Sequence, residues 1–190
     1  DEHYQEFWNQ LSTTILGCVL KIPVANLTDE FIGSQCMDNG EKYTRESLLR
    51  VLNENGMPPE VTLMFAGITA NPHHDTAGVQ HFFETHLFPW LWSNTQGLKN
   101  KGARFYIRSD GCRAQFKCGR HFRWLSNFPT HEWAHQMSVI WSHFESCHGK
   151  DMSDPECGRY KFLMAMAELR GEIIKTAEEA WKFLQKHTST

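Results

Sequence analysis

The stretch Ala103-Arg104-Phe105-Tyr106-Ile107-Arg108-Ser109-Asp110-Gly111 decides the fold class of this 190-residue chain. Its first half, residues 103–107, is rich in aromatic and β-branched side chains and predicts a buried strand. The strand runs into a polar turn at Asp110 and Gly111. An acidic residue at the end of a buried strand is held rigidly at a sheet edge, where it can face a cleft. The sequence therefore predicts a strand that presents Asp110 at such an edge.

Strand and helix patterns alternate on both sides of this stretch. The expected strands cover residues 11–24, 61–68, 103–107 and 137–144. Apolar residues spaced by three and four predict helices over residues 44–52, with Thr44 as N-cap, and over about 75–91. We expect residues 25–43 to form a loop and residues 112–130 to be a basic segment of mixed structure. Interleaved strands and helices predict one domain over residues 1–190, an α/β or α+β sandwich.

The C-terminal helix has the clearest signals. Asp154 followed by Pro155 is typical of a helix start, with the aspartate as N-cap. An apolar face that extends to Leu184 predicts a long helix from about residue 155 to residue 187. Gly171 interrupts this pattern and is expected to bend or split the helix.

Charge is unevenly distributed along the chain. With 19 Lys and Arg against 22 Asp and Glu, the net charge of −3 excludes a uniformly basic nucleic-acid binder. Eight basic residues nevertheless lie in one short segment, in which Asp110 is the only acid, and this predicts a phosphate-binding surface. These residues are Lys99, Lys101, Arg104, Arg108, Arg113, Lys117, Arg120 and Arg123.

Membrane insertion and export are not expected from this sequence. No apolar run approaches the length of a membrane span, and residues 1–6 are polar and acidic, unlike a signal peptide. The six cysteines are therefore expected to be reduced thiols of an intracellular protein.

Asp110 and Asp154 are the candidate metal ligands. Carboxylate oxygens suit hard cations such as Mg²⁺ or Mn²⁺, which activate the attacking oxygen and stabilise the leaving oxygen in phosphodiester chemistry. Taken singly, each residue has a simpler explanation, because Asp before Gly is common in turns and Asp at a helix start is a cap.

Two motifs resemble those of transposon-derived proteins. Residues 107–117 read Ile-Arg-Ser-Asp-Gly-Cys-Arg-Ala-Gln-Phe-Lys and are similar to an "SDG…QFK" signature. Residues 141–154, which contain His148-Gly149-Lys150 and end at Asp154, resemble an "HGK…D" signature. A weaker match joins residues 68–79 to an "HD..aV" helix start. Over roughly residues 5–165 the chain thus resembles the catalytic core of eukaryotic DDE-type transposases, members of the RNase H-like, integrase superfamily.

The resemblance implies an RNase H-like mixed sheet flanked by helices, with Asp110 as the second carboxylate and Asp154 as the third. Both would be catalytic and would hold Mg²⁺ or Mn²⁺. Further acids that could replace them are Glu145, Asp151 and Glu156. The side chains expected to contact nucleic acid are Arg113, Lys117, Arg120, His148, Lys150 and Lys161.

The first carboxylate of such domains lies on a first strand, upstream of the region that residues 3–15 resemble, so we expect that strand to be missing from this chain. The implied function is metal-dependent cleavage and transfer of DNA strands in the nucleus, with DNA and also a further copy of the chain as partners. The alternative is a transposon-derived module that binds nucleic acid or protein and has lost catalysis.

A zinc-stabilised structural domain is the third hypothesis, less favoured because the spacings match no tight zinc knuckle. The residues that could supply a tetrahedral site are Cys112, Cys118, His121, Cys147, His148 and Cys157.

Overall fold

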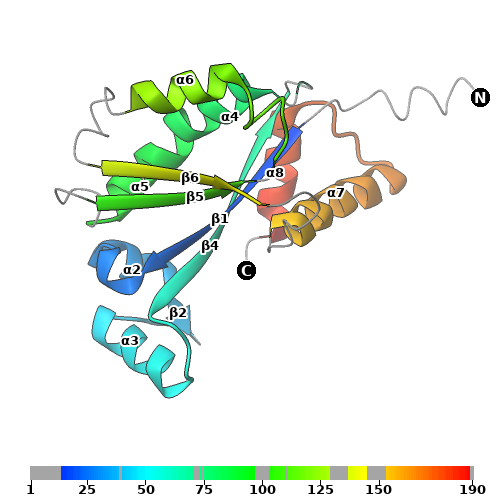
Figure 1. Cartoon of the computed structure of the whole chain (residues 1–190). Coiled ribbons are helices and arrows are strands. Elements are labelled where there is room, and N and C mark those ends of the chain that lie inside the picture. Colours follow the sequence, from blue (N-terminus) through cyan, green and yellow to red (C-terminus); the bar gives the residue numbers. More distant parts are fainter. Residues whose placement is uncertain are drawn as a thin grey trace, which may run out of the picture.

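The computed structural model of the chain describes residues 14–38, 40–70, 73, 75–96, 103–109, 111–128, 137–144 and 153–188. Within these ranges the fold is mixed α/β, with strand pairs packed against helices (Figure 1). The strands are β1 (Thr14–Pro23), β2 (Met37–Asp38), β3 (Glu41–Lys42), β4 (Glu60–Thr69), β5 (Ala103–Ser109) and β6 (Met137–His143). The helices are α2 (Asp29–Gln35), α3 (Arg45–Glu54), α4 (Thr76–Phe82), α5 (Phe88–Asn94), α6 (Gly119–Asn127), α7 (Ser153–Leu169) and α8 (Ala177–Thr188). A 3₁₀ turn, η1 (Val24–Asn26), follows β1, and a π-helical turn, η2 (Phe83–Leu87), joins α4 to α5.

The strands β1 and β4 form a long antiparallel pair, in which Thr14 lies opposite Thr69 and Pro23 opposite Glu60. Successive side chains of a strand point to opposite faces, and apolar side chains of β1 pack against helices on both of its faces. Leu20 and Ile22 belong to the main hydrophobic core, whereas Ile15 packs against the smaller cluster formed by α7 and α8. Helices therefore cover both faces of this pair.

The strands β5 and β6 form a parallel pair, from Ala103 opposite Met137 to Ser109 opposite His143. Parallel neighbours require a crossover connection, and α6 lies within the connection here. Because the two strands run in the same direction, Ser109 and His143 end them at the same sheet edge.

The helical layer over the main core is the continuous run of α4, η2 and α5, with α6 beside it. The helical layer comes close to the sheet at Gly67 of β4, where the ring of Phe82 covers the backbone. A Cβ atom at Gly67 would lie 2.7 Å from Cδ2 of Phe82. Glycine at this position therefore sets how near α4 can pack to the sheet.

The predicted C-terminal helix is split in two. α7 ends at Leu169, and Gly171 adopts φ of +88°, a left-handed conformation that favours glycine. The amide of Gly171 donates to the carbonyl of Glu168 at 2.9 Å, and the amide of Glu172 donates to that of Ala167 at 3.0 Å. These two bonds satisfy the last carbonyls of α7, so Gly171 ends the helix rather than bending it.

One other segment differs from expectation. The predicted loop over residues 25–43 is wrong, since it contains η1, α2 and the β2–β3 pair. Thr28 caps α2 by accepting a hydrogen bond from the amide of Phe31 at 3.2 Å. The mixed segment after β5 contains α6. By contrast, the predicted N-cap of α3 is confirmed, because Thr44 and Ser47 form a capping box.

We predict that Gly17→Ala destabilises the domain. A Cβ atom at Gly17 would lie 2.6 Å from Sγ of Cys157 and 3.3 Å from Cβ of Ser153, at the point where α7 rests on β1. We expect a loss of about 1–3 kcal/mol in the free energy of unfolding, measured by urea denaturation. Cys157→Ala should recover most of that loss in the double variant. A Gly17→Ala loss that is unchanged by Cys157→Ala would contradict the contact.

Candidate functional site

The candidate site lies where β5 and β6 end side by side. Oγ of Ser109 accepts a hydrogen bond from Nε1 of Trp141 at 2.9 Å and lies 3.1 Å from Nδ1 of His143. The amide of Phe144 donates to the carbonyl of Ser109 at 2.8 Å. These bonds hold the two strand ends together and fix where the chain leaves each strand.

Asp110 follows Ser109 directly in the chain and lies outside the described residues. The same holds for the other predicted site residues after β6, namely Glu145, His148, Lys150 and Asp151. Their predicted roles stay predictions.

The turn after β5 brings a lysine back to the end of the strand. The amides of Phe116 and Lys117 donate to the carbonyl of Cys112, at 2.9 and 3.2 Å, and close a tight turn. The side chain of Lys117 then crosses Gly111, where a Cβ atom would lie only 2.7 Å from Nζ. A positive charge is therefore held next to the residue that follows Asp110.

Thr76, the first residue of α4, anchors this turn to the helical layer. Its buried Oγ1 lies 2.9 Å from the carbonyl of Ala114, 2.8 Å from that of Gln115 and 2.9 Å from Sγ of Cys118. The hydrogen bond from Thr76 holds the pKa of Cys118 below its ordinary value. The segment after β5 and the start of α4, which carry two of the three sequence motifs, are thus in direct contact.

The basic segment extends over two parts of the fold, the strand β5 and the turn and helix that follow it. Arg113, Lys117 and Arg120 are exposed in the turn and at the start of α6. Arg104 and Arg108 instead lie on the exposed face of β5. Because successive side chains of a strand point to opposite faces, Arg104 and Arg108, which are four residues apart, share one face.

Tyr106 stands between these two arginines and is 65% exposed, and sequence reasoning did not identify it. The guanidinium of Arg108 lies 4.9 Å from the ring centre of Phe144, within the range of a cation–π contact. The exposed face of β5 is therefore both basic and aromatic. The sequence signal that could have identified Tyr106 is an arginine two residues before it and another two residues after it in a strand, Arg104 and Arg108.

Asp154 and Lys161 are both exposed on α7. The helix begins two residues earlier than expected, at Ser153, so Asp154 lies in its first turn and the predicted N-cap role of Asp154 is wrong. Glu156, a fallback acid, is paired with Arg159 at 2.9 Å. Asp154 is therefore the predicted metal ligand that the described residues leave accessible.

His121 is the most unusual polar residue near the site. It is fully buried on α6, and its ring centre lies 4.6 Å from that of Trp141 and 5.6 Å from that of Trp124. Neither ring nitrogen has a hydrogen-bond partner among the described residues. Burial, and secondarily the charge of nearby His143, lower the pKa of His121, so the ring is held neutral.

The zinc hypothesis gains no geometric support from the described part of the chain. Within it, no group of three or more His, Cys, Asp or Glu side chains is placed to hold a metal ion. Cys118 and His121 lie at the start of α6, whereas Cys157 packs against Gly17 of β1. Cys147 and His148 lie outside the described residues.

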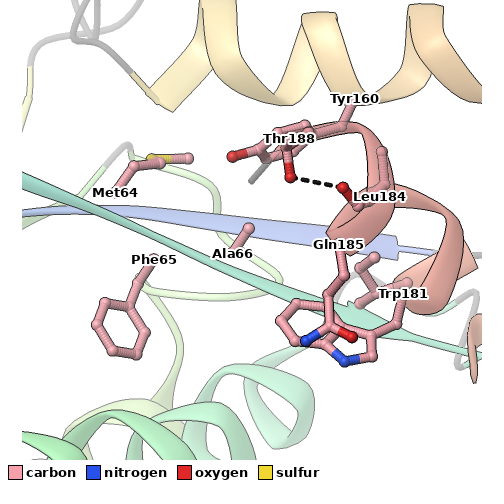
Figure 2. Close-up of a pocket in the computed structure, with 9 residues that line it drawn as sticks. Met64, Phe65, Ala66, Tyr160, Trp181, Leu184, Gln185 and Thr188 are labelled. Atoms are coloured by element: carbon pink, nitrogen blue, oxygen red, sulfur yellow. Dashed lines mark hydrogen bonds between the residues drawn. The ribbon is translucent and has the colours of Figure 1, made fainter. Parts of the chain in front are cut away.

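A pocket of about 320 Å³ lies between β4 and the two C-terminal helices (Figure 2). Its lining residues are Met64, Phe65, Ala66, Ile68, Tyr160, Trp181, Leu184, Gln185 and Thr188. Figure 2 shows the hydroxyl of Thr188 bonded to the carbonyl of Leu184, at 2.6 Å. This lining contains no carboxylate, imidazole or cationic group, so the pocket is not suited to metal or phosphate.

The fold and the site together define a mixed α/β domain with a basic turn at the ends of two parallel strands. The chain belongs to a family of domains of unknown function, DUF8701, which matches residues 57–190. No curated protein and no solved structure matches the chain. None of the helices in the described ranges is long and apolar enough to cross a membrane.

We predict that His121 makes the domain sensitive to acid. Its pKa is lowered in the folded state from about 6.5, so below that pH the unfolded chain binds a proton that the folded chain does not. Stability should therefore fall as the pH drops below about 6.5, by at most about 1.4 kcal/mol per pH unit from this residue. His121→Phe should flatten the dependence in urea denaturation series, whereas His81→Gln, at an exposed histidine, should not. An unchanged slope in His121→Phe would contradict the assignment.

Proposed function

We propose that this domain binds DNA and cuts and joins DNA strands with Mg²⁺ or Mn²⁺, as the catalytic core of a transposase-like protein in the nucleus. The observation that carries the proposal is the parallel pairing of β5 with β6, which ends both strands at one edge. Each of the two sequence motifs continues from one of these strand ends. Parallel pairing therefore supports a common site for Asp110 and the residues that follow β6.

The strand arrangement supports an RNase H-like fold. In that fold β5 and β6 would be the fourth and fifth core strands, and β1 and β4 the second and third. Among the described residues, β1 and β5 each pair with a single strand, so each has an edge available to a further one. No acidic residue occurs in β1, β5 or β6. The first carboxylate would thus come from a further strand.

Asp110 and Asp154 are the residues that would hold the cation, which would activate the attacking oxygen and stabilise the leaving one. In Figure 1 the arrowheads of β5 and β6 point toward the side of the molecule where α7 lies. Asp154 is in the first turn of α7, and the ammonium of Lys117 lies over Gly111, beside Asp110 in the chain. Lys117 is suited to hold a phosphate oxygen next to the metal ligands.

The exposed cations at the turn support the DNA contact. Arg113, Lys117 and Arg120 have no ion-pair partner within the described ranges and are exposed. Unpaired guanidinium and ammonium groups are available to phosphates, and such contacts contribute affinity without reading the sequence. His148, Lys150 and Lys161 stay predicted contacts of the same kind.

We predict that Lys117→Gln weakens DNA binding because it removes one phosphate contact. The slope of log K against log salt concentration should decrease by about 1, measured by fluorescence anisotropy with duplex DNA. Lys186→Gln, at an exposed lysine of α8, is the matched control and should leave the slope unchanged. Equal effects of the two variants would contradict a specific role of the turn.

We predict that Asp110→Asn and Asp154→Asn each abolish Mn²⁺-dependent nicking of plasmid DNA while they preserve DNA binding. Removal of one carboxylate charge weakens the metal site but leaves the basic turn intact. The control is Glu54→Gln, at an exposed carboxylate of α3, which should nick normally. The nicking assay should also use unmodified protein that includes any sequence encoded upstream of residue 1. If that protein binds DNA but does not nick it, the catalytically inactive binding module is favoured instead.

A further inference from the structure

The helix α7 is apolar on two opposite faces. One face, which includes Met164 and Ala167, is buried in the cluster with α8 and the sheet. On the opposite face Phe162 is 63% exposed and Leu169 is 70% exposed. An apolar helix face is normally buried, yet none of the described residues covers the outer face of α7.

The outer face has the spacing of a helix–helix seam. Exposed residues recur at steps of three and four along it: Pro155, Gly158, Phe162, Ala165 and Leu169. This is the a and d pattern of a heptad repeat, in which side chains insert between those of a facing helix. Large residues, Phe162 and Leu169, alternate with small ones, Gly158 and Ala165.

Gly158 has no structural reason within the described part of the chain. Glycine inside a helix costs about 1 kcal/mol relative to alanine. A Cβ atom at Gly158 would meet nothing within 4 Å, and the residue does not adopt a positive φ. Close approach of a second helix would account for a glycine at this exposed position.

We infer that the outer face of α7 is a dimer interface, in which two copies of the chain pair through antiparallel α7 helices. If the two-fold axis passes between Leu163 and Met164, Phe162 faces Ala165 of the second copy. In the same register Leu169 faces Gly158 of the second copy, because both pairs are centred on the same point of the helix. Each large side chain therefore meets a small one, the complementarity that close packing requires.

The charges beside the seam select the same register. Lys161 and Glu168 both flank the apolar face, and neither has an ion-pair partner in the described ranges. They are two helical turns apart in one helix, too far to pair with each other. In the antiparallel arrangement Lys161 lies beside Glu168 of the second copy, and the two-fold axis repeats this pair. In a parallel arrangement Lys161 would instead lie beside Met166 of the second copy, which offers no charge.

α7 is accessible to such a partner, because it lies at the outer edge of the molecule in Figure 1. The inference does not depend on the proposed DNA cleavage. It assigns Lys161 to a carboxylate of a second copy instead of to a DNA phosphate.

The experiment is sedimentation equilibrium of the full chain over a concentration series. The expected mass is twice the 22.1 kDa of a single chain. Phe162→Asp should raise the dissociation constant by on the order of 100-fold or more, since each dimer loses two buried anchors. The matched control is Phe122→Asp on α6, where the ring is 54% exposed, and it should leave the dimer intact.

Gly158→Leu separates loss of pairing from loss of folding. It fills the space for Leu169 of the second copy but improves the helix propensity of α7, so the variant should be monomeric and still fold cooperatively on thermal denaturation. Lys161→Glu and Glu168→Lys should each weaken the dimer by about tenfold, and the double variant K161E/E168K should restore it.

Four results would overturn all or part of the inference. A mass of 22.1 kDa at every concentration would show that no dimer forms. A dimer that resists both Phe162→Asp and Gly158→Leu would use another surface. Failure of K161E/E168K to recover the dimer would exclude the antiparallel register. A loss of DNA affinity in Lys161→Glu with unchanged mass would assign this lysine to DNA instead.

Discussion

The parallel pairing of β5 with β6 is the constraint on which the rest of the site depends. The chain must leave the sheet after Ser109 and return at Met137, and the connection between them contains α6. Trp141 of β6 and Trp124 of α6 both contact the ring of Phe83 from the helical layer. This aromatic contact holds the crossover against the core, so the turn at residues 111–118 is presented at a fixed position on the sheet edge.

The sequence predicts correctly those structural elements that are determined by residues a few positions apart. The strand at residues 61–68 and the cap at Thr44 are confirmed, because β-branched runs and capping residues act over a few positions. The sequence predicts that Gly171 either bends or splits the last helix. The left-handed backbone conformation of Gly171 shows that the helix is split. The prediction of a loop over residues 25–43 is wrong, since α2 is short and depends on burial of Phe31 and Ile32 in the distant core.

The candidate site was predictable in residue type but only partly in arrangement. The sequence indicates that Arg104, Arg108 and Lys117 form one basic group, yet the first two lie on β5 and Lys117 lies in the turn that follows it. The bond network of Thr76 with residues 114–118 joins segments far apart in the chain and has no local signal. His121 was assigned to a possible zinc site, whereas the aromatic cage around it is a product of tertiary packing.

The close contact of Phe82 with Gly67 links the evolution of two positions on different elements. Any side chain at residue 67 would meet the ring of Phe82 at once, since a Cβ atom there would lie 2.7 Å from Cδ2. A sequence of this fold that gains a larger residue at one position must therefore shrink the other or move α4 outward. Among diverged family members, these two columns of an alignment should vary together while their summed volume stays nearly constant.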